Sequence, residues 1–238
     1  MLIIDNFSPN YSKKPRKKNK IKFIIIHYTG MQSEIESIKR LKNSKTKVSC
    51  HYLINRKGKI TRLVKERYEA WHAGKSKWKK LQNLNEYSIG IELVNKGHKI
   101  RYEKFPNLQI KSLIKLCINL KKKYKIKNQN FLGHSDIAPL RKVDPGEKFP
   151  WKKLSKFKIG KWYKNNKLKT FKKPETENNY NIFFNNLGKI GYGYFKISKR
   201  QKSDKKIIKA FKLRYLQKDI SPKIDKKTLQ ISHFLANN

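Results

Sequence analysis

Short runs of apolar residues suggest that the first 150 positions are rich in β-strands. Residues 23–28 form a continuous run with many β-branched side chains, which predicts a buried strand. Residues 88–94 predict a second strand whose alternate positions point to opposite faces. One face carries Ile89, Ile91 and Leu93, and the other carries Gly90, Glu92 and Val94. Residues 48–54, 60–64 and 131–134 predict three more strands.

Helical spacing of apolar residues occurs in two segments between these strands. Ser33 with Glu36 three positions later fits a capping box, which predicts that a short helix begins there. A longer helix running to about Tyr124 is predicted by an apolar stripe of Ile110, Leu113, Ile114, Cys117 and Leu120. Residues 135–151 are interrupted by proline and glycine, and they predict a long loop after the last strand.

The pattern divides the chain into four segments. Residues 1–20 predict an extended leader, and residues 21–163 hold the predicted strands and helices of the main domain. Residues 164–179 are polar and contain Pro174, which is typical of a linker. Residues 180–238 predict a small domain of three amphipathic helices. Their apolar positions are Ile182, Phe183, Leu187 and Ile190 in the first helix, Ile207, Ile208, Phe211 and Tyr215 in the second, and Thr228, Ile231 and Leu235 in the third.

The chain is strongly basic, with a formal charge of +44 from 60 Lys and Arg against 16 Asp and Glu. Because the excess is nearly all lysine and is spread along the whole chain, we favour drifted amino-acid usage over selection for an acidic partner. The chain contains no helix-turn-helix, zinc-finger or RNA-reading motif, so we expect no specific nucleic-acid partner. Two cysteines are too few for a disulfide scaffold.

Two features of the sequence bear on location. No stretch approaches the roughly 20 apolar residues that a transmembrane helix needs. A secretory signal has its basic region before an apolar core, whereas here Asp5 interrupts the first apolar residues and residues 13–22 are basic. We therefore expect a cytoplasmic protein, with the envelope or periplasm as the alternative.

Candidate metal-binding residues lie at or after the ends of predicted strands. His27 ends one strand, His134 follows another, and Asp144 stands ten positions later in the long loop. Two histidines and a carboxylate with one open position are the protein ligands of a catalytic zinc site. Lys142 is close enough to Asp144 to stabilise an oxyanion beside a metal, and Glu92 is a lone carboxylate on an apolar strand, where burial is costly unless the group is paired or used.

Six stretches, in order, resemble the type-2 family of zinc-dependent N-acetylmuramoyl-L-alanine amidases, which is related to phage lysozyme-amidases and peptidoglycan recognition proteins. They are residues 24–30 (IIIHYTG), 48–54 (VSCHYLI), 70–74 (AWHAG), 88–93 (SIGIEL), 133–139 (GHSDIAP) and 141–151 (RKVDPGEKFPW). Each also lies in a fitting structural context. The resemblance implies an α/β fold, with a mixed central β-sheet flanked by helices and a zinc cleft at one edge.

The resemblance also implies roles for individual residues. It assigns His27, His134 and Asp144 as metal ligands for one zinc ion per chain. It assigns Glu92 as the catalytic acid and base and Lys142 as the group that stabilises the oxyanion. Trp71 and His72 match a stretch near the substrate groove, and for His72 a structural turn is the alternative to substrate contact.

The implied activity is hydrolysis of the amide bond between N-acetylmuramic acid, or its anhydro form, and L-alanine. The expected partner is peptidoglycan or a muropeptide, and we expect a monomer. The C-terminal helices resemble a small peptidoglycan-binding domain, although Ser221-Pro222 stands where a glycine is common. A peptidoglycan-binding protein without catalysis is the first alternative, and a basic nucleic-acid-binding protein is a remote one. Recycling of muropeptides and trimming of intact wall both fit the chemistry.

Overall fold

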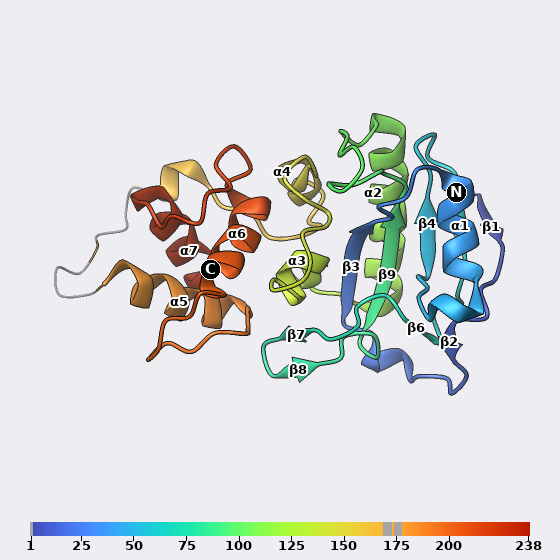
Figure 1. Cartoon of the computed structure of the whole chain (residues 1–238), viewed down its shortest axis with the longest axis horizontal. Coiled ribbons are helices and arrows are strands. Elements are labelled where there is room, and N and C mark those ends of the chain that lie inside the picture. Colours follow the sequence, from blue (N-terminus) through green and yellow to red (C-terminus); the bar gives the residue numbers. More distant parts are fainter. Residues whose placement is uncertain (1, 169–172, 174–177) are drawn as a thin grey trace.

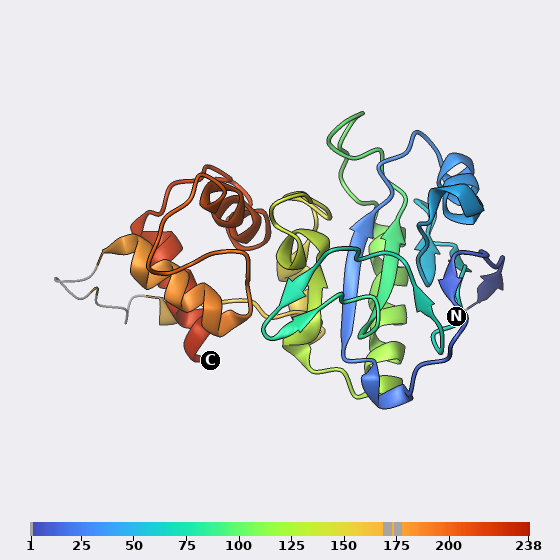
Figure 2. The same cartoon turned by 60° about the horizontal axis from the view of Figure 1, so that its bottom comes forward.

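A mixed β-sheet and a group of three C-terminal helices lie side by side in the computed structural model, which describes residues 2–168, 173 and 178–238 (Figure 1). Figure 2 shows the same arrangement after a 60° turn, with the orange and red helices at one side of the sheet. The predicted class, a mixed central sheet flanked by helices, is confirmed. Within the described ranges, no helix combines the length and the apolar character that crossing a bilayer requires.

Six strands form the central sheet in the order β1–β5–β4–β9–β3–β10. Their bounds are β1 (Ile3–Asp5), β3 (Phe23–Tyr28), β4 (Tyr52–Ile54), β5 (Ile60–Arg62), β9 (Ser88–Leu93) and β10 (Phe131–Gly133). Every neighbouring pair is parallel except β4 and β5. Because β3, β9 and β10 run parallel, their carboxyl ends meet at one edge, which is where sheets of this kind bind ligands.

Helix α2 (Asn107–Tyr124) covers one face of the sheet, as its apolar stripe predicted. Ile89, Ile91 and Leu93 of β9 are fully buried in the same cluster, so the predicted alternation of this strand is confirmed. Ile24 and Ile26 of β3 join them from the neighbouring strand.

Helix α1 (Glu34–Lys42) lies on the other face, near β4. Its N-cap is Ser33, whose Oγ accepts a hydrogen bond from Glu36 N at 3.1 Å, so this half of the predicted capping box is confirmed. The Glu36 carboxylate accepts instead from Gln32 N, one residue before the expected partner. Leu41 and Val94 belong to a small apolar cluster beneath the helix.

Several short elements differ from the sequence prediction. The strand expected over residues 48–54 begins only at Tyr52, because Gly90 N–H on the neighbouring strand donates to the His51 ring rather than to a backbone carbonyl. Residues 3–5 of the predicted leader pair with β5, so they extend the sheet. Four short strands were not predicted, namely β2 (Tyr11–Ser12), β6 (Glu69–Ala70), β7 (Lys77–Trp78) and β8 (Leu81–Gln82).

The loop after β10 is interrupted by two short helices, α3 (His134–Ile137) and α4 (Trp151–Ser155), which lie between the sheet and the C-terminal helices (Figure 1). The remaining short helices have 3₁₀ geometry and are η1 (Lys18–Lys20), η2 (Ser44–Thr46), η3 (Asn128–Asn130) and η4 (Asn165–Lys167). Helix α3 starts directly at His134, which places this side chain at the carboxyl edge of the sheet.

The three predicted C-terminal helices are present as α5 (Asn179–Ile190), α6 (Asp204–Tyr215) and α7 (Lys226–Asn237). Their predicted apolar positions are buried apart from Ile190, which is partly exposed. One hydrophobic cluster runs from Phe23 and Ile25 of the sheet through Ile137 of α3 to Phe183 and Phe211 of these helices. The helices therefore share a core with the sheet. Half of the predicted linker, residues 169–172 and 174–177, lies outside the described residues.

Candidate functional site

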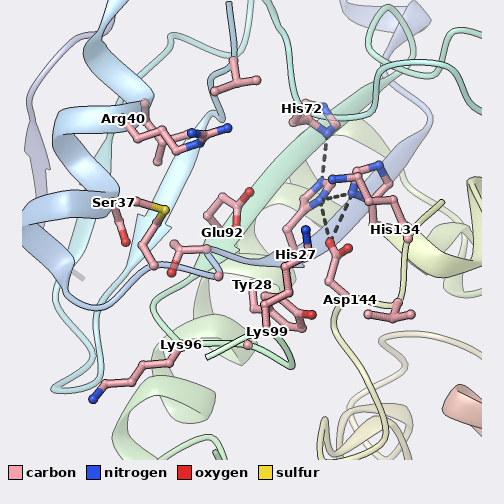
Figure 3. Close-up of a pocket in the computed structure, with 18 of the residues that line it drawn as sticks. His27, Tyr28, Ser37, Arg40, His72, Glu92, Lys96, Lys99, His134 and Asp144 are labelled. Atoms are coloured by element: carbon pink, nitrogen blue, oxygen red, sulfur yellow. Dashed lines mark hydrogen bonds and ion pairs between the residues drawn. The ribbon is translucent and has the colours of Figure 1, made fainter. Parts of the chain in front are cut away.

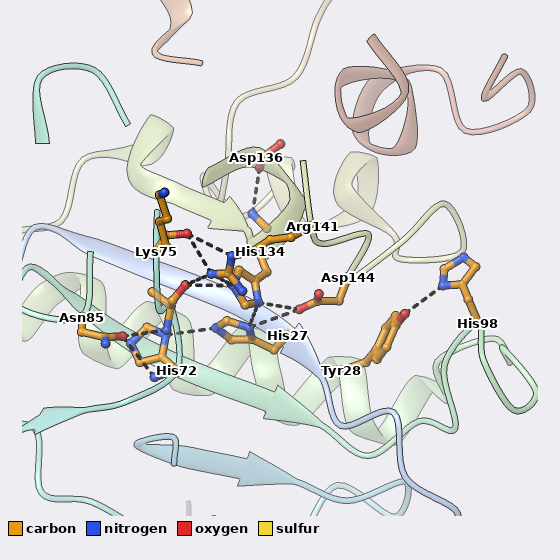
Figure 4. A network of polar contacts seen from close by, with 12 residues as sticks. His27, Tyr28, His72, Lys75, Asn85, His98, His134, Asp136, Arg141 and Asp144 are labelled. Atoms are coloured by element: carbon orange, nitrogen blue, oxygen red, sulfur yellow. Dashed lines mark hydrogen bonds and ion pairs between the residues drawn. The ribbon is translucent and has the colours of Figure 1, made fainter. Parts of the chain in front are cut away.

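The three predicted ligand atoms converge at the carboxyl edge of the sheet (Figure 4). The Nδ1 atoms of His27 and His134 lie 2.9 Å apart, and each lies 3.2 Å from Asp144 Oδ2. His27 belongs to β3 and His134 follows the adjacent β10, so strand pairing holds the two rings together. A backbone hydrogen bond from Ser135 N to Asp144 O brings the long loop back to the histidines.

This donor set fits a divalent metal. Zinc lies about 2.0–2.1 Å from nitrogen and oxygen ligands, so three ligands of a tetrahedral site are about 3.4 Å from one another. The observed separations of 2.9 and 3.2 Å are shorter than this value by at most about half an ångström. His134 Nε2 donates to the Ala73 carbonyl at 3.1 Å, and a neutral ring then leaves Nδ1 as a free lone pair. The site thus gathers lone pairs that only a shared cation or proton can hold so close together.

Electrostatics keep the candidate ligands His27 and Asp144 in the forms that bind metals. Burial, and then the neighbouring His134, lower the pKa of His27 to about 4, so its ring is neutral near pH 7. Burial alone would raise the pKa of Asp144, but the two histidines lower it well below its usual range. A neutral imidazole beside an ionised carboxylate is the state that coordinates a metal.

Glu92 lies beside the donor set on the neighbouring strand. It is the register partner of His27, and its Oε2 atom is buried without a hydrogen-bond partner among the described residues. Burial, and then the charge of Asp144, raise the pKa of Glu92 to about 8. A carboxyl group poised near neutral pH at a cleft is suited to moving protons.

A cleft of about 480 Å³ unites the seven residues that the sequence singled out. They are His27, Trp71, His72, Glu92, His134, Lys142 and Asp144. The volume is within the usual range for a small-molecule site. Figure 3 shows Glu92 between the histidines on one side and helix α1 on the other, so the candidate base lies inside the cleft.

Trp71 and His72 occupy different positions in the wall of this cleft. Trp71 is partly exposed, and its indole N–H donates to Ser12 Oγ at 3.2 Å. His72 is 9% exposed, and its Nδ1 lies 3.0 Å from His27 Nε2. The stretch next to the groove is therefore close to the donor set, and contact of either residue with substrate stays a prediction.

Three cations in the lining of the cleft were not predicted from the sequence. Arg40 on α1 and Lys96 and Lys99 after β9 line it (Figure 3). Among so many lysines, no pattern distinguishes these from the rest.

The role of Gly90 could have been predicted from the sequence, because a glycine inside a strand often marks a close approach of another group. A Cβ atom built at this position would lie 2.3 Å from the His72 ring.

Comparisons with known proteins agree with this geometry. The family model described as N-acetylmuramoyl-L-alanine amidase matches residues 17–147. The chain is 33% identical over 231 residues to the N-acetylmuramoyl-L-alanine amidase AmiD of Escherichia coli (strain K12), covering 91% of this chain and 82% of AmiD. It is 32% identical over 164 residues to the 1,6-anhydro-N-acetylmuramyl-L-alanine amidase AmpD of Haemophilus influenzae, covering 61% of this chain and 86% of AmpD.

Two solved structures are similar over nearly the whole chain. The complex of E. coli AmiD with anhydro-N-acetylmuramic acid-L-Ala-D-γ-Glu-L-Lys has a TM-score of 0.82 at 31% identity, covering 94% of this chain and 91% of that one. AmpDh3 of Pseudomonas aeruginosa in complex with anhydromuramic pentapeptide has a TM-score of 0.81 at 28% identity, covering 98% and 97%. With its fold, its His–His–Asp donor set and these matches, the chain belongs to the N-acetylmuramoyl-L-alanine amidase family.

Proposed function

We propose that this chain hydrolyses the amide bond between N-acetylmuramic acid, or its anhydro form, and L-alanine in peptidoglycan or muropeptides. The observation that carries the proposal is the convergence of His27, His134 and Asp144 next to Glu92 in one cleft, in a chain of the amidase family. An intact donor set beside a carboxyl group with a raised pKa argues against a protein that only binds peptidoglycan.

The metal is proposed to be zinc, one ion per chain, held by His27 Nδ1, His134 Nδ1 and Asp144 Oδ2. Two imidazoles and one carboxylate suit zinc and leave a position open for catalysis. When bound, the metal supplies Lewis acidity, which makes a water acidic near neutral pH and polarises a carbonyl.

Glu92 would accept a proton from the attacking water while the water oxygen bonds to the lactyl carbonyl carbon. The same carboxyl group would then protonate the amine of L-alanine as the carbon–nitrogen bond breaks. Lys142 lines the cleft and lowers the energy of nearby negative charge, so its ammonium group would stabilise the oxyanion. The products are a muramic acid carboxylate and a peptide with a free L-alanine amine.

Two observations about the substrate support the proposed amidase activity. The relatives AmiD and AmpDh3 have been solved with anhydromuramyl peptides, which supports the anhydro form as a substrate class. Arg40, Lys96 and Lys99 add positive charge to the lining of the cleft. Such a lining complements the carboxylates of a stem peptide.

The domain boundaries, the residues near the substrate, the oligomeric state, the location and the cellular role are also proposals. We propose a catalytic domain over residues 21–163 and a peptidoglycan-binding-like domain over residues 180–238, with Trp71 and His72 near the substrate. We also propose a monomer. A cytoplasmic location and a recycling role stay predictions, with the envelope and wall trimming as the alternatives.

Mass-spectrometric product analysis tests the function directly. Purified protein is incubated separately with an anhydro-muropeptide and with intact sacculi, each with and without a chelator. Release of a peptide that begins with L-alanine, lost on chelation and restored by zinc, is expected. If the metal-loaded protein released no peptide from either substrate, the amidase proposal would be wrong and a binding protein would remain.

A further inference from the structure

The buried ring of His72 stands in a row of polar groups that ends at His27 (Figure 4). Ser88 Oγ lies 2.5 Å from the Leu84 carbonyl oxygen and 3.2 Å from His72 Nε2. On the other side of the ring, His72 Nδ1 lies 3.0 Å from His27 Nε2. His27 Nδ1 then faces the metal site, so the row runs from a backbone carbonyl to a proposed ligand.

The direction of every hydrogen bond in this row follows from its first member. A carbonyl oxygen can only accept, so the one hydroxyl hydrogen of Ser88 goes to Leu84. Ser88 Oγ must then accept from His72 Nε2–H. The His72 ring is buried and its two partners, Ser88 and His27, carry no negative charge, so a second proton would be an unpaired buried charge and the ring carries a single N–H. His72 Nδ1 is therefore an acceptor, His27 donates from Nε2, and His27 Nδ1 is left as a lone pair.

The neighbouring residue orients the second imidazole in the same way. The Ala73 carbonyl accepts from His134 Nε2, which leaves His134 Nδ1 as a lone pair. Arg141 Nη2 is also close to His134 Nε2, but its two hydrogens go to the carbonyls of Ala73 and Lys75. Asn85 Oδ1 accepts from both His72 N and Ala73 N, which holds this stretch of backbone in place.

Packing leaves His72 no alternative position. A Cβ atom at position 90 would lie 2.3 Å from its ring, so only glycine leaves room for the imidazole between the strand and His27. The rings of His72 and His27 meet edge to face, with centroids 5.1 Å apart. Both ring nitrogens of His72 are occupied within the protein.

We propose that His72 is a positioning residue for the metal site: anchored by Ser88, it sets the tautomer of His27 so that Nδ1 points to the metal. The inference rests on the proposed function, in which His27 is a ligand. It assigns His72 a role through another residue and adds Ser88 and Leu84 to the site. Partners that orient a ligating histidine typically change metal affinity by about 10–100-fold when they are removed.

The first test is the tautomer itself, measured in the zinc-loaded wild-type protein by long-range ¹H–¹⁵N NMR of the imidazoles near pH 7. His27, His72 and His134 should each carry hydrogen on Nε2. Hydrogen on Nδ1 of His27 or His72 would overturn the inference without any variant.

The second test compares zinc dissociation constants by competition with a chromophoric chelator. His72→Leu removes the acceptor and should weaken zinc binding about 10–100-fold. His72→Asn keeps an acceptor near the position of Nδ1 and should recover part of the loss. Ser88→Ala removes only the anchor and should weaken binding less than His72→Leu does. Equal affinity of His72→Leu and wild type would contradict the proposal.

Ser76→Ala is the matched control for Ser88→Ala. Both serines are buried and both bond to the backbone of Leu84. Ser76 Oγ donates to Gly74 O and accepts from Leu84 N, and among the described residues no histidine bonds to it. Ser76→Ala should keep the zinc affinity of wild type, and an equal loss in both serine variants would mean that only loop stability is involved. If wild type binds zinc and releases peptide while His72→Leu binds equally tightly, the inference alone fails. If wild type neither binds zinc nor releases peptide, the proposed function fails with it.

Discussion

Replacing Arg214 by methionine tests how firmly the C-terminal helices are coupled to the metal site. Arg214 of α6 is 2% exposed and forms an ion pair with Asp136, which is 1% exposed and stands two residues after His134. Its Nη2 also donates to Phe131 O at 3.0 Å, and the guanidinium lies 4.0 Å from the centre of the Trp151 ring. The side chain therefore joins α6 to the strand and the helix on either side of His134.

The expected cost follows from the buried carboxylate that the variant leaves behind. Removing one partner of a buried ion pair typically destabilises a protein by about 3–5 kcal/mol. Asp136 keeps the hydrogen bonds from Gly133 N at 2.8 Å and Tyr192 Oη at 2.6 Å, and Arg214 Nε has no partner among the described residues. Both facts favour the lower half of that range. For a chain of this length, such a loss lowers Tm by roughly 6–16 °C.

Urea unfolding followed by tryptophan fluorescence measures the loss, and a double-mutant cycle assigns it. Arg214→Met and Asp136→Asn should each destabilise the protein, and the double variant should cost clearly less than their sum because no buried charge is left unpaired. A loss below about 1 kcal/mol for Arg214→Met, or strictly additive losses, would refute the reasoning. It would mean that the ion pair is not what couples the helices to the site.

Three further predictions concern the chemistry of the cleft. Glu92→Gln should lower kcat about 10²–10⁴-fold with zinc still bound, as measured by peptide release together with metal content, and near-normal turnover would exclude Glu92 as the base. In the metal-free protein the pKa of Glu92 is about 8, above its usual value of 4.5, so the native state binds the extra proton and stability should fall as pH rises between these values. Urea unfolding should therefore find Glu92→Gln more stable than wild type at pH 9 but not at pH 4, and a parallel pH dependence of the two proteins would contradict the raised pKa. Lys142→Met should reduce kcat about 10²–10³-fold with little change in zinc affinity. A rise in KM of the same size with kcat unchanged would instead assign Lys142 to substrate binding.

The local elements and the residues of the His–His–Asp donor set could be predicted from the sequence alone. The apolar run that becomes β3, the alternation of β9 and the stripe of α2 each depend on neighbouring residues, and periodicity reports such local preferences directly. His27 and His134 could be placed at strand ends for the same reason. The resemblance of six ordered stretches then supplied roles that spacing alone left open.

Other features were decided only by the tertiary structure. The 2.9 Å approach of His27 to His134, the fit of His72 against Gly90 and the ion pair of Arg214 with Asp136 all join residues that are distant in the chain. The short strands β1, β2 and β6 likewise exist because a partner strand lies beside them, and not because of their own composition. Local preferences cannot report such contacts, since the free energy that fixes them comes from packing and hydrogen bonding between elements that meet only when the chain has folded.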